Sequence, residues 1–139
     1  MAKFSGKSAI VAVDDSGGVA RTISADVVGY EIEDGAPGQD VTGFGEGNIN
    51  YIPGQKVQKI TLTVLWNTAA TTGAMTVLRG IVGSTTSKTV TITPEGSGLA
   101  FSGEFMCEGI TPSGSSDGSP ISLGTVSFLP MGGVAAAWA

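Results

Sequence analysis

The feature that most constrains this chain is a repeated alternation of apolar and polar residues with a period of two. Residues 57–66 show it most clearly. One side of this segment carries Ile60, Leu62, Val64 and Trp66, and the other carries Lys59, Thr61 and Thr63. Successive side chains of a β-strand point to opposite faces, so this spacing predicts a strand with one buried face.

Similar alternation predicts further strands. We expect them over residues 8–13, 19–24, 27–33, 88–94, 101–108 and 121–129. The first two are expected to pair as a hairpin across the turn Asp14–Gly18, because Asp and Gly favour tight turns. In residues 27–33 the side chains of Val28, Tyr30 and Ile32 are expected to share a face, with Glu31 and Glu33 opposite.

Residues 101–108 have the same pattern. We expect Phe101, Gly103, Phe105 and Cys107 on the core face and Ser102, Glu104, Met106 and Glu108 on the other. Cys107 is expected to be a small buried hydrophobe, since no histidine exists to activate it.

One segment has a helical period instead. In residues 72–82, Met75, Leu78 and Val82 recur at a spacing of three to four, with Ile81 alongside, and Thr72 is a candidate N-cap. The predicted fold is mainly β, an antiparallel sandwich or barrel with one flanking α-helix, in a single domain over residues 1–139. The lack of a βαβ pattern argues against a parallel sheet.

Composition narrows the possible functions. Charged residues make up 14% of the chain, against roughly 25% in an average protein. Such depletion is typical of proteins with large subunit interfaces. The net charge is −5, and the seven Lys and Arg residues are scattered. Tight nucleic-acid binding is therefore not expected, because it needs a concentrated basic surface.

The sequence does not predict an enzyme. Histidine is absent and there is one cysteine, which removes the common catalytic triads, histidine metal sites and an internal disulfide. Asp14 and Asp15 fit turn chemistry, and the glutamate pairs on strands fit a solvated face. No cofactor and no metal is expected. The start of the chain has no signal-peptide pattern and no segment is apolar enough to span a membrane, so we expect a soluble intracellular protein.

The glycine-rich stretch Gly43–Gly47 resembles a phosphate-binding loop only superficially. A dinucleotide loop requires a strand before it and a helix after it, and a Walker loop requires a Gly-Lys-Ser/Thr ending. The residues that follow open no helix, and Glu46 would repel phosphate.

We therefore interpret residues 34–54 as a long loop. It carries four apolar residues, Phe44, Ile49, Tyr51 and Ile52. Two interpretations remain open here: these side chains contact another protein, or they fold back onto their own domain.

The order of these segments resembles the major tail tube protein of long-tailed bacteriophages. The resemblance covers nearly the whole chain. It rests on Ala2–Lys7 leading into a strand, Asp14–Gly18, Asp40–Gly45, residues 57–66, Asn67–Ala74 leading into Leu78, and Phe101–Glu104. The tube proteins of contractile secretion systems are similar in fold.

This resemblance implies a virion protein that assembles, in the host cytoplasm, as hexameric rings stacked into a tube for DNA ejection. Partners would be further copies of the chain, tail-tip, tape-measure and terminator proteins, and DNA that passes without tight binding; no membrane is involved. Rings would stack through the N-terminal segment with Phe4, the loop 34–54 with Phe44, Ile49, Tyr51 and Ile52, and the arm 130–139 with Trp138. An acidic lumen would use Glu104 and Glu108, then Glu31 and Glu33. Alternatives are a capsid decoration protein, a head–tail joining protein or a small ligand-binding β domain.

Overall fold

The computed structural model describes Lys3 and residues 5–139. Phe4, an expected ring contact, lies outside the described residues. The helices are the 3₁₀ turns η1 (Gly6–Ser8) and η2 (Ser24–Asp26) and the α-helix α1 (Ala74–Ile81). The strands are β1 (Ile10–Asp14), β2 (Ala20–Thr22), β3 (Val27–Gly35), β4 (Gly38–Asp40), β5 (Tyr51–Pro53), β6 (Val57–Leu65), β7 (Lys88–Thr93), β8 (Phe101–Cys107), β9 (Ser122–Pro130) and β10 (Ala137–Trp138).

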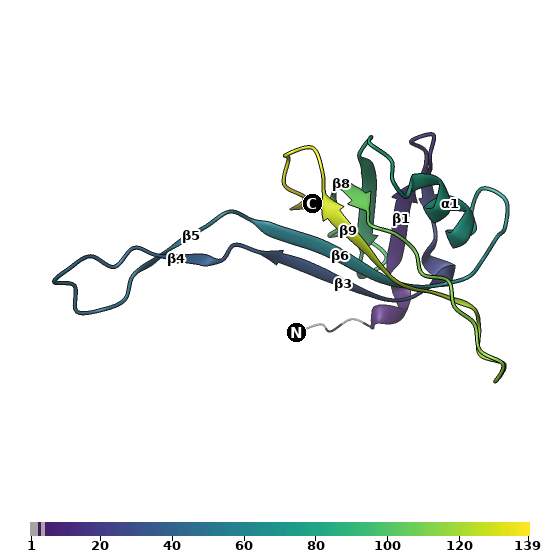
Figure 1. Ribbon diagram of the computed structural model, residues 1–139, viewed down its shortest axis with the longest axis horizontal. Helices are drawn as coiled ribbons and strands as arrows, with labels where there is room; N and C mark the ends of the chain where they lie inside the picture. The colour runs from purple at the N-terminus through teal and green to yellow at the C-terminus, as the bar shows by residue number, and fades with distance from the viewer. Residues whose placement is uncertain (1–2, 4) are drawn as a thin grey trace.

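Eight of these strands form one antiparallel sheet. Its order is β2-β1-β7-β8-β9-β6-β3, and β10 pairs with β8 beside that path. The pairing of β1 with β2 confirms the predicted first hairpin. The expected fold class, mainly β and antiparallel with one flanking helix, is confirmed over the described residues (Figure 1).

The sheet folds over at the junction between β8 and β9. These two strands share only three residue pairs, from Phe105 opposite Pro130 to Cys107 opposite Phe128. At the other end of β8, the strand β10 takes the adjacent position and pairs with Phe101 and Ser102. The two halves of the sheet, β2-β1-β7-β8 and β9-β6-β3, therefore enclose one core between them.

Side chains from both halves and from α1 fill this core. The predicted alternation is confirmed in β6 and β7, where every second residue is buried, and in β8, where Phe101, Phe105 and Cys107 are buried and Gly103 is half-buried. The largest fully buried side chains include Phe101, Phe105, Phe128, Ile60, Leu62 and Leu78. Trp66 was expected on the same face as Leu62, but it lies beyond the end of β6 and is 39% exposed.

The predicted face of β3 is wrong at one residue. The register between β3 and β6 shifts between Val27 and Gly29, so Val28 is an extra residue in a β-bulge. Val27, Tyr30 and Ile32 pack against the core, while Val28 is exposed. A bulge of one residue reverses the alternation on one side of it, which the sequence pattern did not reveal.

The helix is shorter than predicted and is capped differently. It begins at Ala74, and Gly73 occupies the N-cap position without a side-chain hydrogen bond. The acceptor at this end of the helix is Asp26 in η2 and not the predicted Thr72: the Asp26 carboxylate accepts a hydrogen bond from the Ala74 N–H at 3.2 Å. Val77, Leu78 and Ile81 are buried, whereas Val82 is exposed and Met75 is half-buried. The cap is supplied by a residue distant in sequence.

Candidate assembly surfaces

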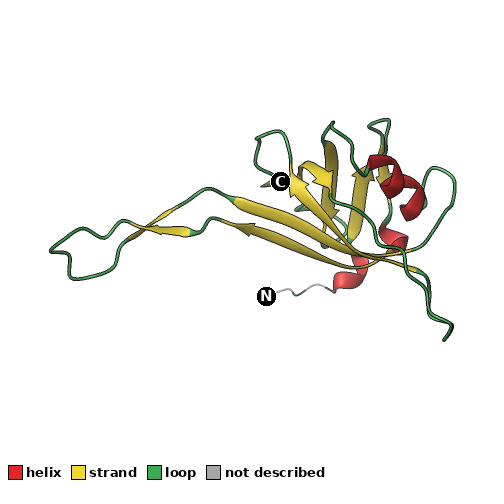
Figure 2. Ribbon diagram, in the orientation of Figure 1, coloured by secondary structure: helices red, strands yellow, loops and turns green. Residues whose placement is uncertain are grey.

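The segment expected to be a long loop is a projecting β-hairpin. β4 and β5 pair in antiparallel register, with Asp40 opposite Tyr51 and Gly38 opposite Pro53. They continue the direction of β3 and β6 beyond the sheet, and the hairpin extends far from the core (Figure 2). Residues 33–53 are all exposed. The hairpin is therefore held by its own hydrogen bonds and not by packing on the domain.

The tip of the hairpin is fastened by polar contacts. The Val41 N–H donates to the Asn50 carbonyl at 2.9 Å, and the Asn50 N–H donates to Thr42 Oγ1 at 2.8 Å. The Asn50 amide also donates to Glu46 Oε2 at 2.6 Å. Hydrogen bonds from Thr42 hold the pKa of Asp40 below its ordinary value. These bonds give the tip a defined shape despite its glycines.

The four apolar side chains predicted for contact are all on this hairpin and all accessible. Phe44 is fully exposed, and Ile49, Tyr51 and Ile52 are 64%, 63% and 52% exposed. This exposure excludes the interpretation that they fold back onto their own domain. Apolar side chains gathered on a projecting element are typical of a contact with another protein.

The middle of the outward face of β3, β6 and β9 carries polar and acidic side chains. Glu31 lies opposite Thr61, and Thr61 lies opposite Ser127. The Glu108 N–H donates to the Ser127 carbonyl at 2.9 Å, which places Glu108 at the far end of this row. Glu33 lies opposite Lys59 on β6. We call this surface the acidic face; it contains three of the four predicted lumen residues, Glu31, Glu33 and Glu108.

The fourth predicted lumen residue, Glu104, lies on the other half of the sheet. Its carboxylate is half-buried and accepts hydrogen bonds from the hydroxyls of Ser87, at 2.9 Å, and Thr89. Glu108 directly follows β8, which ends at Cys107, and its N–H bonds to Ser127 of β9. Glu104 lies within β8 and is held by hydroxyl groups, whereas Glu108 lies at the end of that strand beside β9.

The C-terminal arm packs on its own sheet. The Trp138 ring lies 5.0 Å from the Phe101 ring, and its Nε1–H donates to Asp34 Oδ2 at 3.3 Å. Two residues before Trp138, the backbone N–H and carbonyl of Ala136 both bond to the buried side-chain amide of Gln58. The arm is thus part of the fold, and Trp138 keeps 41% of its surface exposed.

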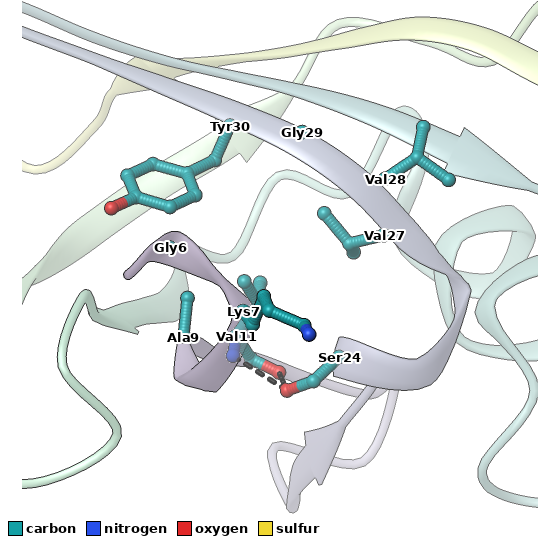
Figure 3. A pocket seen from close by; sticks show the side chains of 9 residues that line it. All are labelled: Gly6, Lys7, Ala9, Val11, Ser24, Val27, Val28, Gly29 and Tyr30. Atoms are coloured by element: carbon teal, nitrogen blue, oxygen red, sulfur yellow. Dashed lines mark hydrogen bonds between the residues drawn. The ribbon is translucent and has the colours of Figure 1, made fainter. Parts of the chain in front are cut away.

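A cavity of about 460 Å³ lies between η1 and the beginning of β3. We call it the N-terminal groove; its lining includes Lys7, Ala9, Val11, Ser24, Val27 and Tyr30. Ser24 Oγ accepts from the Val11 N–H at 2.8 Å and forms part of the floor. The Lys7 side chain extends into the space between η1 and Val27 (Figure 3). No sequence motif indicated this groove, because the segments that line it meet only in the folded chain.

Sequence reasoning also missed two buried polar residues. Gln58 is in phase with Ile60 and Leu62, and Lys88 is in phase with Val90 and Ile92, so both occupy core-facing positions. The Lys88 ammonium donates to the Ser16 carbonyl at 3.3 Å. A polar residue on the apolar side of an alternating strand was the available signal, because such a residue must find a partner on burial.

Three features of the described residues bear on reactivity and membrane crossing: the one thiol, the possible metal ligands and the helices. Burial raises the pKa of the Cys107 thiol, and the neighbouring Glu108 charge acts in the same direction, so the thiolate is disfavoured. Within Lys3 and 5–139, no three His, Cys, Asp or Glu side chains are grouped so that they could hold a metal ion. None of the described helices is long and apolar enough to cross a membrane.

Comparison with known proteins places the fold. No family model matches the chain, and no curated protein sequence matches it. A chain of a structure described as the virion of a native gene transfer agent particle superposes with a TM-score of 0.77 at 19% identity, covering 99% of both chains. The chain has that fold. A chain from the tail of an empty gene transfer agent particle with C6 symmetry gives a TM-score of 0.73 at 20% identity, again over 99% of both chains.

The likeness to solved tail structures supports the resemblance stated from the sequence. The likeness extends over 99% of both chains in each case. At such low identity the comparison establishes the fold, and the function has to be argued from the surfaces described above.

Proposed function

We propose that this chain is a structural subunit of a phage-type tail tube, which polymerises as stacked hexameric rings around a channel for DNA. The observation that carries the proposal is the full-length fold match to a chain of a C6-symmetric tail. The exposed apolar hairpin and the low charge content support it, because both are typical of a protein that is buried in an assembly.

Ring closure would use the edge of the sheet. β3 is a nine-residue strand at the end of the strand order, and among the described residues no strand pairs with its outer edge. An open edge of this length is a hazard for uncontrolled aggregation, and closing a ring removes it. A repeated head-to-tail contact around a rotation axis closes such a ring.

We assign the acidic face to the lumen. It combines three glutamates, Glu31, Glu33 and Glu108, with one lysine, Lys59, and the short side chains between them are threonine and serine. An excess of negative charge repels DNA phosphates, so that DNA passes without being retained. The carboxylate of Glu104 on β8 is held by the hydroxyl groups of Ser87 and Thr89, and we place this residue away from the channel.

The projecting hairpin would join successive rings, together with the N-terminal segment and the exposed part of the C-terminal arm around Trp138. Tail-tip, tape-measure and terminator proteins would meet the ends and the interior of the tube. The chain would be located in the virion tail, after assembly in the host cytoplasm, and would have no catalytic role.

Electron microscopy of the purified protein tests the proposal. We expect six-fold rings stacked into tubes with a central channel, formed at high protein concentration or on added tail-tip complexes. Single rings that never stack would identify a joining protein instead, and a protein that stays monomeric under both conditions would also overturn the proposal.

A further inference from the structure

The hairpin and the N-terminal groove lie at opposite ends of β3. The strand begins at Val27, which lines the groove, and ends at Gly35, next to the hairpin (Figure 1). A nine-residue strand is about 30 Å long at roughly 3.3 Å per residue. Copies arranged head to tail along this direction would bring the hairpin of one copy to the groove of the next, as an open heterologous stack requires.

The hairpin tip presents Phe44, the most exposed of the four apolar side chains predicted for contact. Phe44 is fully exposed, and the hydrogen bonds of Thr42, Glu46 and Asn50 fix the backbone around it. A large apolar side chain on a preorganised tip loses little conformational freedom when it binds, which is typical of an anchor residue in an interface.

The groove has the size and lining to accept such an anchor. Its volume of about 460 Å³ lies within the range of roughly 300–1,000 Å³ usual for binding pockets. Val27 and Ala9 supply apolar surface. The cavities at the hairpin base, lined by Pro37 and Gly54, and beside the C-terminal arm lie at the same end of the sheet as the hairpin itself. They are not positioned to receive it from the next copy.

The charges of the two surfaces are complementary. Residues 38–53 contain Asp40 and Glu46 and no basic residue, whereas residues 1–13 contain Lys3 and Lys7 and no acidic residue. Among the described residues the ion pairs are Arg21–Asp15 and Lys56–Asp34, so Lys7 belongs to neither. Complementary charge favours this pairing and disfavours hairpin-to-hairpin contact.

We propose that Phe44 of one copy inserts into the N-terminal groove of a copy in the adjacent ring, with Glu46 facing Lys7. This inference rests on the proposed tube and specifies the residues that join its rings. The occupant of the groove is a second copy of this chain.

Charge reversal tests the Glu46–Lys7 contact. Lys7→Glu or Glu46→Lys alone should reduce the amount of sedimenting tube at least about tenfold, since like charges in an interface are strongly disfavoured. The double variant should restore tubes. Arg79→Glu, on the exposed side of α1, combined with Glu46→Lys is the matched control and should give no rescue. Circular dichroism must show that each variant monomer is folded.

Cysteine cross-linking tests the position of the tip. In a Cys107→Ala background, Gly43→Cys with Ser8→Cys should link copies into long chains on a non-reducing gel, while Gly43→Cys with Thr85→Cys should not. If tubes form but Gly43→Cys and Ser8→Cys do not cross-link, or if the double charge reversal does not restore tubes, this inference is wrong while the proposed tube stands. A wild-type protein that never forms tubes would overturn both.

Discussion

The buried side chain of Gln58 bonds to both backbone groups of Ala136, as the backbone of a paired strand would. Its Nε2–H donates to the Ala136 carbonyl at 2.8 Å, and its Oε1 accepts from the Ala136 N–H at 2.9 Å. Gln58 is 4% exposed and Ala136 is 3% exposed. These two bonds join the beginning of β6 to the C-terminal arm, just before β10 pairs with β8.

Replacing Gln58 should therefore release the arm. Gln58→Ala leaves two buried backbone groups unpaired, and we expect a loss of about 2 kcal/mol or more in the free energy of unfolding. Urea denaturation measures it, and proteolysis of the arm should become faster. The exposed neighbour Gln55 provides the control Gln55→Ala. Equal stability of the two variants would show that the arm is held by other contacts.

Asp26 should be important for α1, and Thr72 should not. Asp26→Ala removes the acceptor for the Ala74 N–H and two hydrogen bonds from the Asn67 amide, at 3.0 and 3.1 Å. We expect a loss of about 1–2 kcal/mol in thermal or urea unfolding, as for other N-caps. Thr72→Ala should change stability by less than about 0.5 kcal/mol. A larger loss of stability in Thr72→Ala than in Asp26→Ala would show that Thr72 is the N-cap after all.

Asp15 should contribute stability that is lost in acid. Hydrogen bonds from the Val19 N–H and the Arg21 guanidinium lower the pKa of Asp15 below its ordinary value of 3.8. The folded pKa is below the unfolded one, so the contribution is present above the unfolded pKa and disappears as the pH falls through the folded pKa.

Asp15→Asn should accordingly flatten the fall in melting temperature between about pH 5 and pH 2. Glu95→Gln, in the turn after β7, is the control and should leave the profile of the wild type. An unchanged profile for Asp15→Asn would mean that other carboxylates determine the acid sensitivity.

Exposed hairpin residues should matter for assembly and not for folding. Phe44→Ser and Tyr51→Ser should leave monomer stability within about 0.5 kcal/mol, because both side chains are exposed in the free chain. Tube growth, followed by light scattering and microscopy, should stop. Leu99→Ser removes another exposed apolar side chain, outside the hairpin, and this variant should still assemble. Unfolding of the hairpin variants would show instead that the hairpin supports the domain.

The acidic face should control whether a tube retains DNA. Glu31→Lys with Glu33→Lys should still form tubes, but these tubes should hold double-stranded DNA at low salt and release it as salt rises. Adding Glu108→Lys should increase retention. Glu95→Lys, which makes the same change of charge outside the acidic face, is the control and should not cause DNA retention. Tubes that remain free of DNA in the triple variant would place the acidic face outside the channel.

Much of this fold could be predicted because alternation is a local signal. The strands with buried every-second residues, the first hairpin and the helix around Leu78 all follow from patterns within ten or so residues. The exposed apolar residues of the hairpin were also visible as a group, since Phe44, Ile49, Tyr51 and Ile52 are close in sequence. Their strand pairing was missed because β4 and β5 have three residues each, and β4, with the sequence Gly-Gln-Asp, has a weak strand preference.

The remaining features depend on contacts between distant residues. The bulge at Val28, the cap of α1 by Asp26 and the partner of Gln58 each involve a segment from another part of the chain.

The sequence by itself determined which residues are apolar, which alternate, and that the chain carries few charges and no histidine. Those properties decided the fold class and the absence of a common catalytic set. Only the tertiary structure decided which strands share an edge, which glutamates share a face and where the N-terminal groove opens. The physical reason is that side-chain period is fixed by local backbone geometry, whereas sheet order and surface grouping arise from packing across the whole chain.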